Sequence, residues 1–187
     1  DVGRGYETLR RRLESRLTAL GAHAAPPEAS PATRSDIPLT TRRDAFLAVV
    51  EADRTARALY LETMLAQTMV NQVLAADGDV RTLAYLPWLA PGARDVELLS
   101  SRSDEDPPFW RTLLGFTLPG VGSGMVELLH RSPDTSFTLY LDAPKTSARA
   151  LAALRAAPLP HDARCLGAYP TPAHMRGGIL AMLLRRD

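Results

Sequence analysis

The only cysteine of the chain and two of its four histidines lie in one short stretch, HDARCLGAYPTPAH. His161, Cys165 and His174 have the spacing H-x3-C-x8-H. A cysteine beside a histidine base can act as a nucleophile, and three or four such side chains can bind zinc. Structural zinc sites usually pair their ligands closely, as in C-x2-C, and this chain has no such pair. We therefore predict no catalytic residue and no metal ligand here, and interpret Cys165 as a small buried side chain on a strand.

A glycine-rich segment, LPGVGSGMVELL, is the second candidate for chemistry. Gly120, Gly122 and Gly124 could form a nest of backbone N–H groups around a phosphate. The dinucleotide signature requires G-x-G-x-x-G between a strand and a helix, whereas this segment reads G-x-G-x-G and leads into a predicted strand. We therefore expect a hairpin or bulge. The alternative is a pocket that unites these glycines with His130, Cys165, His161 and His174.

An acidic segment with two prolines, SRSDEDPPFW, is predicted to be a loop. Its carboxylates lack the D-x-D-x-D-G pattern of a calcium loop, which indicates a solvated run of charge. Phe109 and Trp110 end the segment, and tryptophan is enriched at the energetic centres of protein interfaces. They are candidate interaction residues; the alternative is that they fold back over the core.

Composition limits the possible classes of protein. The chain has 187 residues, of which 45% are hydrophobic and 23% are charged, as in a soluble globular protein. It lacks the run of about 20 apolar residues that a transmembrane helix needs, and one cysteine cannot form an internal disulfide. Because the sequence begins with Asp1, removal of an N-terminal targeting segment stays an open alternative.

Charge is distributed unevenly along the chain. The net charge is +1, but the middle of the sequence is acidic and residues 145–187 are basic. This asymmetry would let two copies, or two parts of one copy, attract each other. It falls short of the basic stripe of a nucleic-acid-binding protein, so we do not favour a nucleic-acid partner, and no motif calls for a cofactor.

An amphipathic helix is predicted within residues 1–20. Leu9, Leu13 and Leu17 form a narrow apolar seam of the kind that packs on a partner. Residues 21–40 are rich in proline and alanine and read as a linker. The seam either docks on another chain or folds back on its own domain.

Residues 41–187 are expected to form one α+β domain. The apolar pattern over 41–77 contains no proline and predicts one long helix, ended by Gly78 and buried on all sides in its second half. Alternating segments then predict an antiparallel sheet of about five strands, with a hairpin at SPDT and one late helix at TSARALAALRAA. The stretch 172–186 is either a helix or part of a last strand pair, and we favour the strands. The predicted fold is thus α+β, with a tethered N-terminal helix and one long helix.

The function that this organisation favours is a non-catalytic protein-binding subunit, adaptor or assembly or regulatory factor. It would act through the N-terminal helix and an exposed face of the α+β domain, with a protein partner or a second copy. The alternative is a small-molecule-binding domain or enzyme, with its pocket between the long helix and the sheet.

Overall fold

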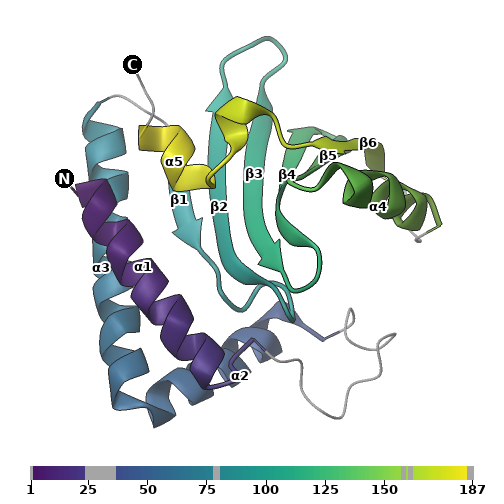
Figure 1. Ribbon diagram of the computed structural model, residues 1–187. Coiled ribbons are helices and arrows are strands. Elements are labelled where there is room, and N and C mark those ends of the chain that lie inside the picture. The colour runs from purple at the N-terminus through teal and green to yellow at the C-terminus, as the bar shows by residue number, and fades with distance from the viewer. Residues whose placement is uncertain (1, 24–36, 78–80, 157–158, 160–161, 185–187) are drawn as a thin grey trace.

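A computed structural model describes residues 2–23, 37–77, 81–156, 159 and 162–184. It confirms the α+β class, with helices and one mixed sheet (Figure 1). The helices and the 3₁₀ turn are α1 (Val2–Ala19), α2 (Leu39–Ala52), α3 (Arg54–Ala76), α4 (Pro144–Ala156), η2 (Ala173–Met175) and α5 (Ile179–Leu184). The strands are β1 (Thr82–Tyr85), β2 (Arg94–Ser103), β3 (Phe109–Leu118), β4 (Gly122–Arg131), β5 (Asp134–Leu141) and β6 (Ala163–Pro170).

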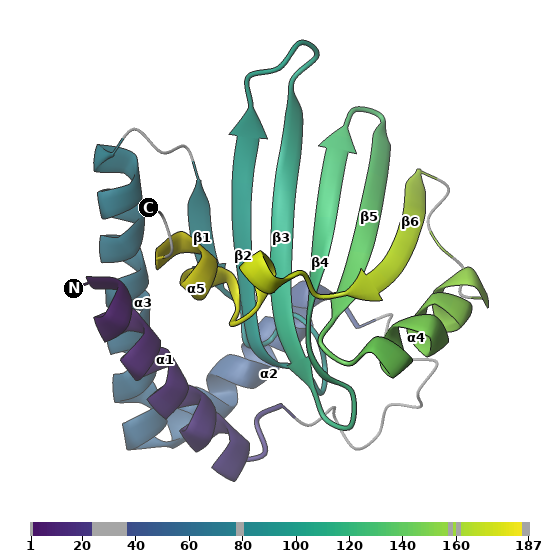
Figure 2. The ribbon, with the colours of Figure 1, turned by 45° about the horizontal axis from the view of Figure 1, so that its top comes forward.

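The sheet follows the order of the chain, β1-β2-β3-β4-β5-β6. The first five strands pair antiparallel as a meander, including the predicted hairpin between β4 and β5. The expectation of a wholly antiparallel sheet is wrong at its last strand, because β6 runs parallel to β5. A parallel neighbour requires a crossover connection, and α4 supplies it (Figure 2).

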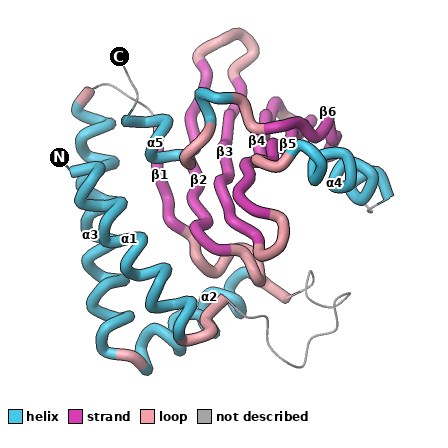
Figure 3. The backbone as a smooth tube through the Cα atoms, in the orientation of Figure 1, coloured by secondary structure: helices cyan, strands magenta, loops and turns pink. Residues whose placement is uncertain are grey.

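The predicted long helix is two helices that meet at Asp53 (Figure 3). Asp53 is extended, with φ −120° and ψ 114°, and its side chain accepts a hydrogen bond from the backbone N–H of Ala56. It therefore caps α3 at its N-terminus. Arg16 of α1 pairs with the same carboxylate, with Nε 3.1 Å from Oδ1, and this fixes the break against the first helix. Gly78, the predicted stop, lies outside the described residues.

The C-terminal segment is helical where we favoured strands. After β6 the chain forms the 3₁₀ turn η2 and then α5. Gly177 and Gly178 between them have φ of 92° and 88°, a left-handed conformation that glycine adopts without a steric penalty. The two glycines therefore reverse the chain, and α5 comes to contact β2 and β3.

The core lies between one face of the sheet and the helices α1, α3 and α5. In Figure 1, α1 and α3 lie together at the β1 edge of the sheet, and α4 lies at the β6 edge. Leu13 and Leu17 are fully buried in the same apolar cluster as Leu83, Leu99 and Ile179. The N-terminal helix thus folds back on its own chain, the second of the two alternatives. Most of the linker predicted over residues 21–40 lies outside the described residues.

The two faces of the sheet differ in composition. Register places Tyr85, Glu97, Gly115 and Met125 in one row across β1 to β4, on the face that the core helices cover. A row on the opposite face is entirely aliphatic and half-buried: Leu98, Leu114, Val126 and Leu139. The covered face therefore carries the buried polar groups from which a site could be built.

Candidate functional site

A cavity of about 320 Å³ lies on the covered face of the sheet, between α1, the strands β2 to β4 and the segment from η2 to α5. We call it the α1–sheet cavity. Its polar lining comes from α1, from the strands and from the chain that follows them; it consists of Arg10, Arg11, Asp95, Glu97, Thr117, Ser123, Asp142 and Thr171. Its apolar lining includes Met125, Met175 and Ile179.

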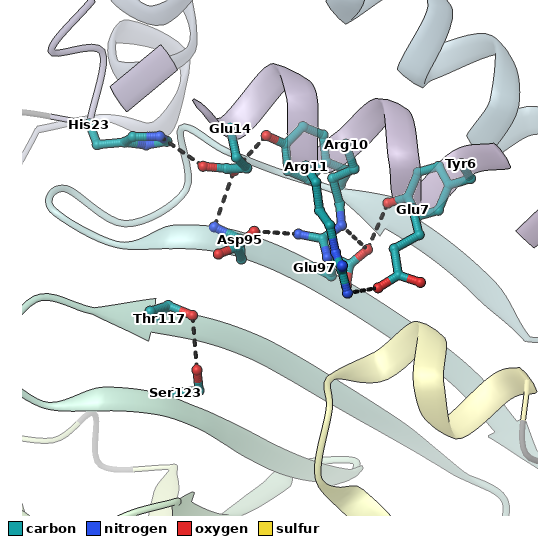
Figure 4. A network of polar contacts seen from close by, with 11 residues as sticks. Tyr6, Glu7, Arg10, Arg11, Glu14, His23, Asp95, Glu97, Thr117 and Ser123 are labelled. Atoms are coloured by element: carbon teal, nitrogen blue, oxygen red, sulfur yellow. Dashed lines mark hydrogen bonds and ion pairs between the residues drawn. The ribbon is translucent and has the colours of Figure 1, made fainter. Parts of the chain in front are cut away.

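A cluster of charged and phenolic groups lies beside this cavity, and Figure 4 shows its polar contacts; Arg10, Asp95 and Glu97 line the cavity. Tyr6 donates a hydrogen bond to Glu97 Oε1 over 2.8 Å, and Arg10 Nε lies 3.2 Å from the same oxygen. A terminal nitrogen of Arg10 lies 2.5 Å from Asp95 Oδ1. Because Tyr6 and Arg10 are four residues apart on α1, they lie one above the other on one helix face. The cluster therefore fastens α1 to β2.

A second cluster, one helical turn further along α1, is centred on Glu14. Its Oε1 accepts hydrogen bonds from the Tyr85 hydroxyl at 2.5 Å and from the Asp95 backbone N–H at 3.1 Å. Its Oε2 lies 2.9 Å from Nε2 of the buried His23. Asp95 has a φ of 52°, which is uncommon outside glycine, and it lies at an irregularity in the β2–β3 register. Arg10 and Glu14 thus hold this unusual residue from two sides.

Burial and pairing shift the pKa values of these groups. Burial raises the pKa of Glu97, although Arg10 and the Tyr6 hydroxyl act in the opposite direction. Burial also raises the pKa of Glu14, but hydrogen bonds from His23 and Tyr85 outweigh it and the net pKa is lowered. The pKa of Tyr6 is raised, first by burial and then by the charge of Glu97. Two carboxylates on neighbouring elements are thus shifted in opposite directions.

The cavity has groups that could orient a small polar ligand. Thr117 and Ser123 face each other across β3 and β4, with their hydroxyl oxygens 3.1 Å apart. Thr171 is 5% exposed, and its hydroxyl makes no hydrogen bond within the described part of the chain. Arg11 pairs with Glu7, and Arg10 with two carboxylates, so most of the charge is already neutralised. The arrangement suits hydrogen bonding more than attraction of a charged ligand.

The structure does not bring the predicted histidines and cysteine together. His130 on β4 is exposed, and its Nδ1 lies 2.8 Å from the Thr135 hydroxyl. Cys165 is on β6, two strands away, a separation of roughly 10 Å that excludes a hydrogen bond between them. His174 is exposed on η2, and His161 lies outside the described residues. Among the described residues, no group of three or more His, Cys, Asp and Glu side chains is placed to hold a metal ion.

The glycine segment forms the predicted hairpin, between β3 and β4. Gly120 and Gly122 have φ of 75° and 97° in the turn, as a tight reversal requires. Gly124 lines the α1–sheet cavity, and its backbone packs closely against Leu141. Of the described residues proposed for the alternative pocket, only Gly124 lines this cavity. These residues therefore do not form a common pocket.

The predicted interaction residues fall into two groups. Leu9 packs against the core and Leu13 and Leu17 lie within it, so this seam is covered by its own chain. Phe109 and Trp110 are not in a loop, as predicted, but begin β3. Trp110 is opposite His130 in the sheet and is 48% exposed, so it remains available to a partner.

An exposed apolar surface on α3 was missed by the sequence analysis. Leu61, Leu65, Met69 and Val73 are spaced by four residues and are 45–64% exposed. We call these four residues the α3 ridge. The sequence predicted burial on all sides because this half of the helix is apolar nearly all round. The opposite side of α3 does face the core, with Leu59, Thr63 and Val70 buried.

Comparisons with known proteins give no family: no family model, no curated protein and no solved structure matches this chain. In the part of the chain that the structure describes, no helix is long and apolar enough to cross a bilayer.

Proposed function

We propose that this chain is a non-catalytic protein-binding subunit or assembly factor, and that its docking surface is the α3 ridge. The observation that carries the proposal is the exposure of four large apolar side chains at four-residue intervals on one helix. Scattered surface leucines are common in soluble proteins, but a contiguous apolar patch usually marks an interaction site.

The chemistry around the α3 ridge supports a protein partner. Residues 63–76 contain no charged side chain, so covering this part of the helix removes no charge from water; its exposed polar side chains are Thr68 and Gln72. Covering a leucine side chain contributes about 1.5–3 kcal/mol when it was fully exposed, and about half of each ridge side chain is exposed. An amphipathic helix laid against the ridge is the recognition mode that suits four anchors spaced by four residues.

Two further surfaces support the same class of function. Trp110 offers an exposed indole at the start of β3, and the aliphatic row on the opposite sheet face is only half-buried. The leucine seam of α1 has no part in the proposal, because it completes the core of its own chain. The sequence predicted two interaction surfaces, the N-terminal helix and an exposed face of the α+β domain. The proposal keeps only the second, with α3 as its main element.

Carbene footprinting tests the proposal, because a diazirine probe labels exposed side chains. We expect strong labelling of residues 61–73 in the dilute purified chain, and clear protection of them in an extract of the cells that make it. Leu166 and Tyr169 on β6, which are 48% and 50% exposed, serve as internal controls and should label equally in both samples. Equal labelling of the ridge in both samples would contradict the proposal.

A second candidate function is binding of a small polar molecule in the α1–sheet cavity. It is favoured by the hydroxyl of Thr171, which is buried against the cavity without a hydrogen bond in the described part of the chain. Thermal-shift screening with uncharged polyols and amides tests it. A ligand that stabilises the native chain, and loses its effect in Ser123→Trp, would support it. Ser123 is exposed on β4, so the larger side chain can fill the cavity mouth. Ligands that act equally on both proteins would contradict it.

A further inference from the structure

A second cavity, of about 540 Å³, lies where the end of α1 meets α2 and the connection between β1 and β2. We call it the α1–α2 cavity. Its lining is mostly apolar and includes Phe46 and Val49 from α2 and Pro87 and Trp88 from the connection. His23 lines it from the chain that follows α1. Small-molecule sites have volumes in this range and combine a mostly apolar lining with a few placed polar groups.

Hydrogen bonds hold the walls of this cavity together. Gly21 follows α1 with a φ of 67°, the left-handed conformation that ends many helices, and it turns the chain toward His23. The His23 carbonyl accepts a hydrogen bond from the Gly92 N–H over 2.8 Å. Arg42 of α2 donates to the Leu89 carbonyl over 3.0 Å. The end of α1 and the start of α2 are therefore both fastened to the connection between β1 and β2.

His23 brings an unused polar atom to this cavity. Its side chain is only 7% exposed, and its Nε2 lies 2.9 Å from Glu14 Oε2 (Figure 4). Because the pKa of Glu14 is lowered, its carboxylate acts as the acceptor, and Nε2 carries the proton of this contact. Within the described part of the chain, Nδ1 of His23 is buried without a hydrogen bond. Glu14 thus holds the ring by one nitrogen and leaves the other without a partner.

We propose that the α1–α2 cavity binds a small uncharged molecule with an apolar ring system and one hydroxyl group, and that this hydroxyl bonds to Nδ1 of His23. A buried polar atom without a partner lowers the stability of the free protein, and a ligand that supplies the partner removes this cost. A hydroxyl suits Nδ1 in either protonation state of the ring, because it both donates and accepts. The ring system would pack against Phe46 and Trp88.

The charges beside the cavity favour an uncharged ligand. Arg42 is the one permanently charged side chain among the described residues that line it, and it already donates to the Leu89 carbonyl. Glu14 is negative and touches His23, so it opposes a carboxylate ligand beside that ring. A cation would leave water for a described lining that offers it no carboxylate. An alcohol or a phenol avoids both costs.

2-Naphthol is the probe that we choose, because it carries one hydroxyl on two fused apolar rings. For a ligand of this size we expect a Kd of about 10–100 μM. 2-Methylnaphthalene has nearly the same shape, with a methyl group in place of the hydroxyl. It leaves the buried nitrogen without a partner, so it should bind about five- to 50-fold more weakly.

NMR titration of the nitrogen-15-labelled full chain tests the inference. The chain has two tryptophans, whose indole N–H groups give separate signals. Trp88 lines the cavity, whereas Trp110 lies on β3 away from it and serves as the internal control. 2-Naphthol should move the Trp88 signal saturably and leave the Trp110 signal in place. Trp110→Phe assigns the two signals.

Two kinds of variant separate binding from folding. His23→Gln keeps a donor for Glu14 but removes the second ring nitrogen, so it should weaken 2-naphthol at least fivefold and change 2-methylnaphthalene less than about twofold. Ala45→Phe, at the exposed edge of the cavity on α2, should fill it and abolish binding. Ala48→Phe is the same change at an exposed position of α2 outside the lining, and it should bind as the wild type does.

Four outcomes would overturn the inference. The first is no saturable shift of Trp88 up to about 1 mM 2-naphthol, tenfold above the weakest expected Kd. The second is equal affinity for 2-naphthol and 2-methylnaphthalene, or no effect of His23→Gln. The third is tighter binding of 2-naphthoate, which would make the ligand an anion. The fourth is binding that moves other signals but not Trp88, as in the hollow of about 250 Å³ that His23 borders with Thr18 and Arg94. None of these outcomes bears on the α3 ridge.

Discussion

The same substitution on two helices should have very different effects on stability. Leu13 on α1 is fully buried in the core, whereas Leu65 on α3 is 64% exposed. Truncating a buried leucine to alanine removes its transfer free energy and leaves a cavity, for a total of about 2–5 kcal/mol. At Leu65 about one third of the side chain is covered, so the transfer contribution scales to less than about 1 kcal/mol. We expect Leu13→Ala to lose several kcal/mol of unfolding free energy and Leu65→Ala to lose less than about 1.

Urea unfolding followed by circular dichroism measures this difference. The chain should be kept dilute, because any association would add a concentration-dependent contribution to its stability. The slope of free energy against urea should not change, since neither substitution alters the surface exposed on unfolding by much.

Comparable losses in the two variants would refute the reasoning. If Leu13→Ala costs less than about 1 kcal/mol, α1 is not part of the core and the leucine seam is free for another chain. If Leu65→Ala costs several kcal/mol in the dilute monomer, the ridge is covered by its own chain and cannot be a docking surface.

Three further predictions concern the polar clusters and one close backbone contact. Burial raises the folded-state pKa of Glu97, so above about pH 4.3 the folded wild type binds this proton more tightly than the unfolded chain does. The wild type therefore loses unfolding free energy as pH rises. Urea unfolding from pH 4 to 7 should show the unfolding free energy of Glu97→Gln increasing relative to that of the wild type. Arg16 and the Ala56 N–H lower the pKa of Asp53 to about 2. The ionised Asp53 therefore stabilises the folded wild type, and this stabilisation should be lost as pH falls from about 4 to 2. Asp53→Asn, which keeps the cap, should not show this loss when thermal unfolding is followed over the same pH range. A Cβ on Gly124 would lie 2.7 Å from Leu141 Cδ2 and 2.8 Å from the Tyr140 carbonyl oxygen, so Gly124→Ala should lower the unfolding free energy by about 1–3 kcal/mol. Gly5→Ala, in an open position on α1, should raise it by about 0.5–1 kcal/mol in the same assay. Equal effects of the two substitutions would contradict the packing described at Gly124.

The α+β class could be predicted because it depends on local periodicity. Alternation in FTLYLD indicated β5, and the proline and aspartate of SPDT indicated the hairpin before it. The parallel pairing of β6 was missed, although the helix between β5 and β6 is the connection that parallel strands require. Strand direction follows from topology, which a period-two pattern does not contain.

The break at Asp53 shows what the helical pattern leaves out. The apolar period runs through residue 53 without a proline, so pattern alone predicts one helix. The capping preference of aspartate was a local signal for the break. The other half of the explanation, the ion pair with Arg16, depends on a residue 37 positions away that periodicity cannot connect to Asp53.

The candidate site was largely invisible in the sequence for the same reason. Tyr6, Arg10 and Glu14 lie at four-residue intervals on α1, a weak sign of a polar stripe beside the leucine seam. Their partners Asp95 and Glu97 are more than 80 residues away, at an irregular strand that sequence rules do not specify. The α3 ridge had a visible signal in its spacing, but a helix that is apolar nearly all round gives no sign of which side faces solvent.

Site-specific photo-cross-linking in the cells that make this chain shows whether the α3 ridge is a protein interface. A photoreactive amino acid in place of Leu65 should form a covalent protein adduct, and the same residue in place of Arg12, which is exposed on α1, should not. We expect an adduct clearly heavier than the 20.3 kDa single chain. The absence of any adduct at Leu65, or an equal yield of adduct at Arg12, would contradict the interface.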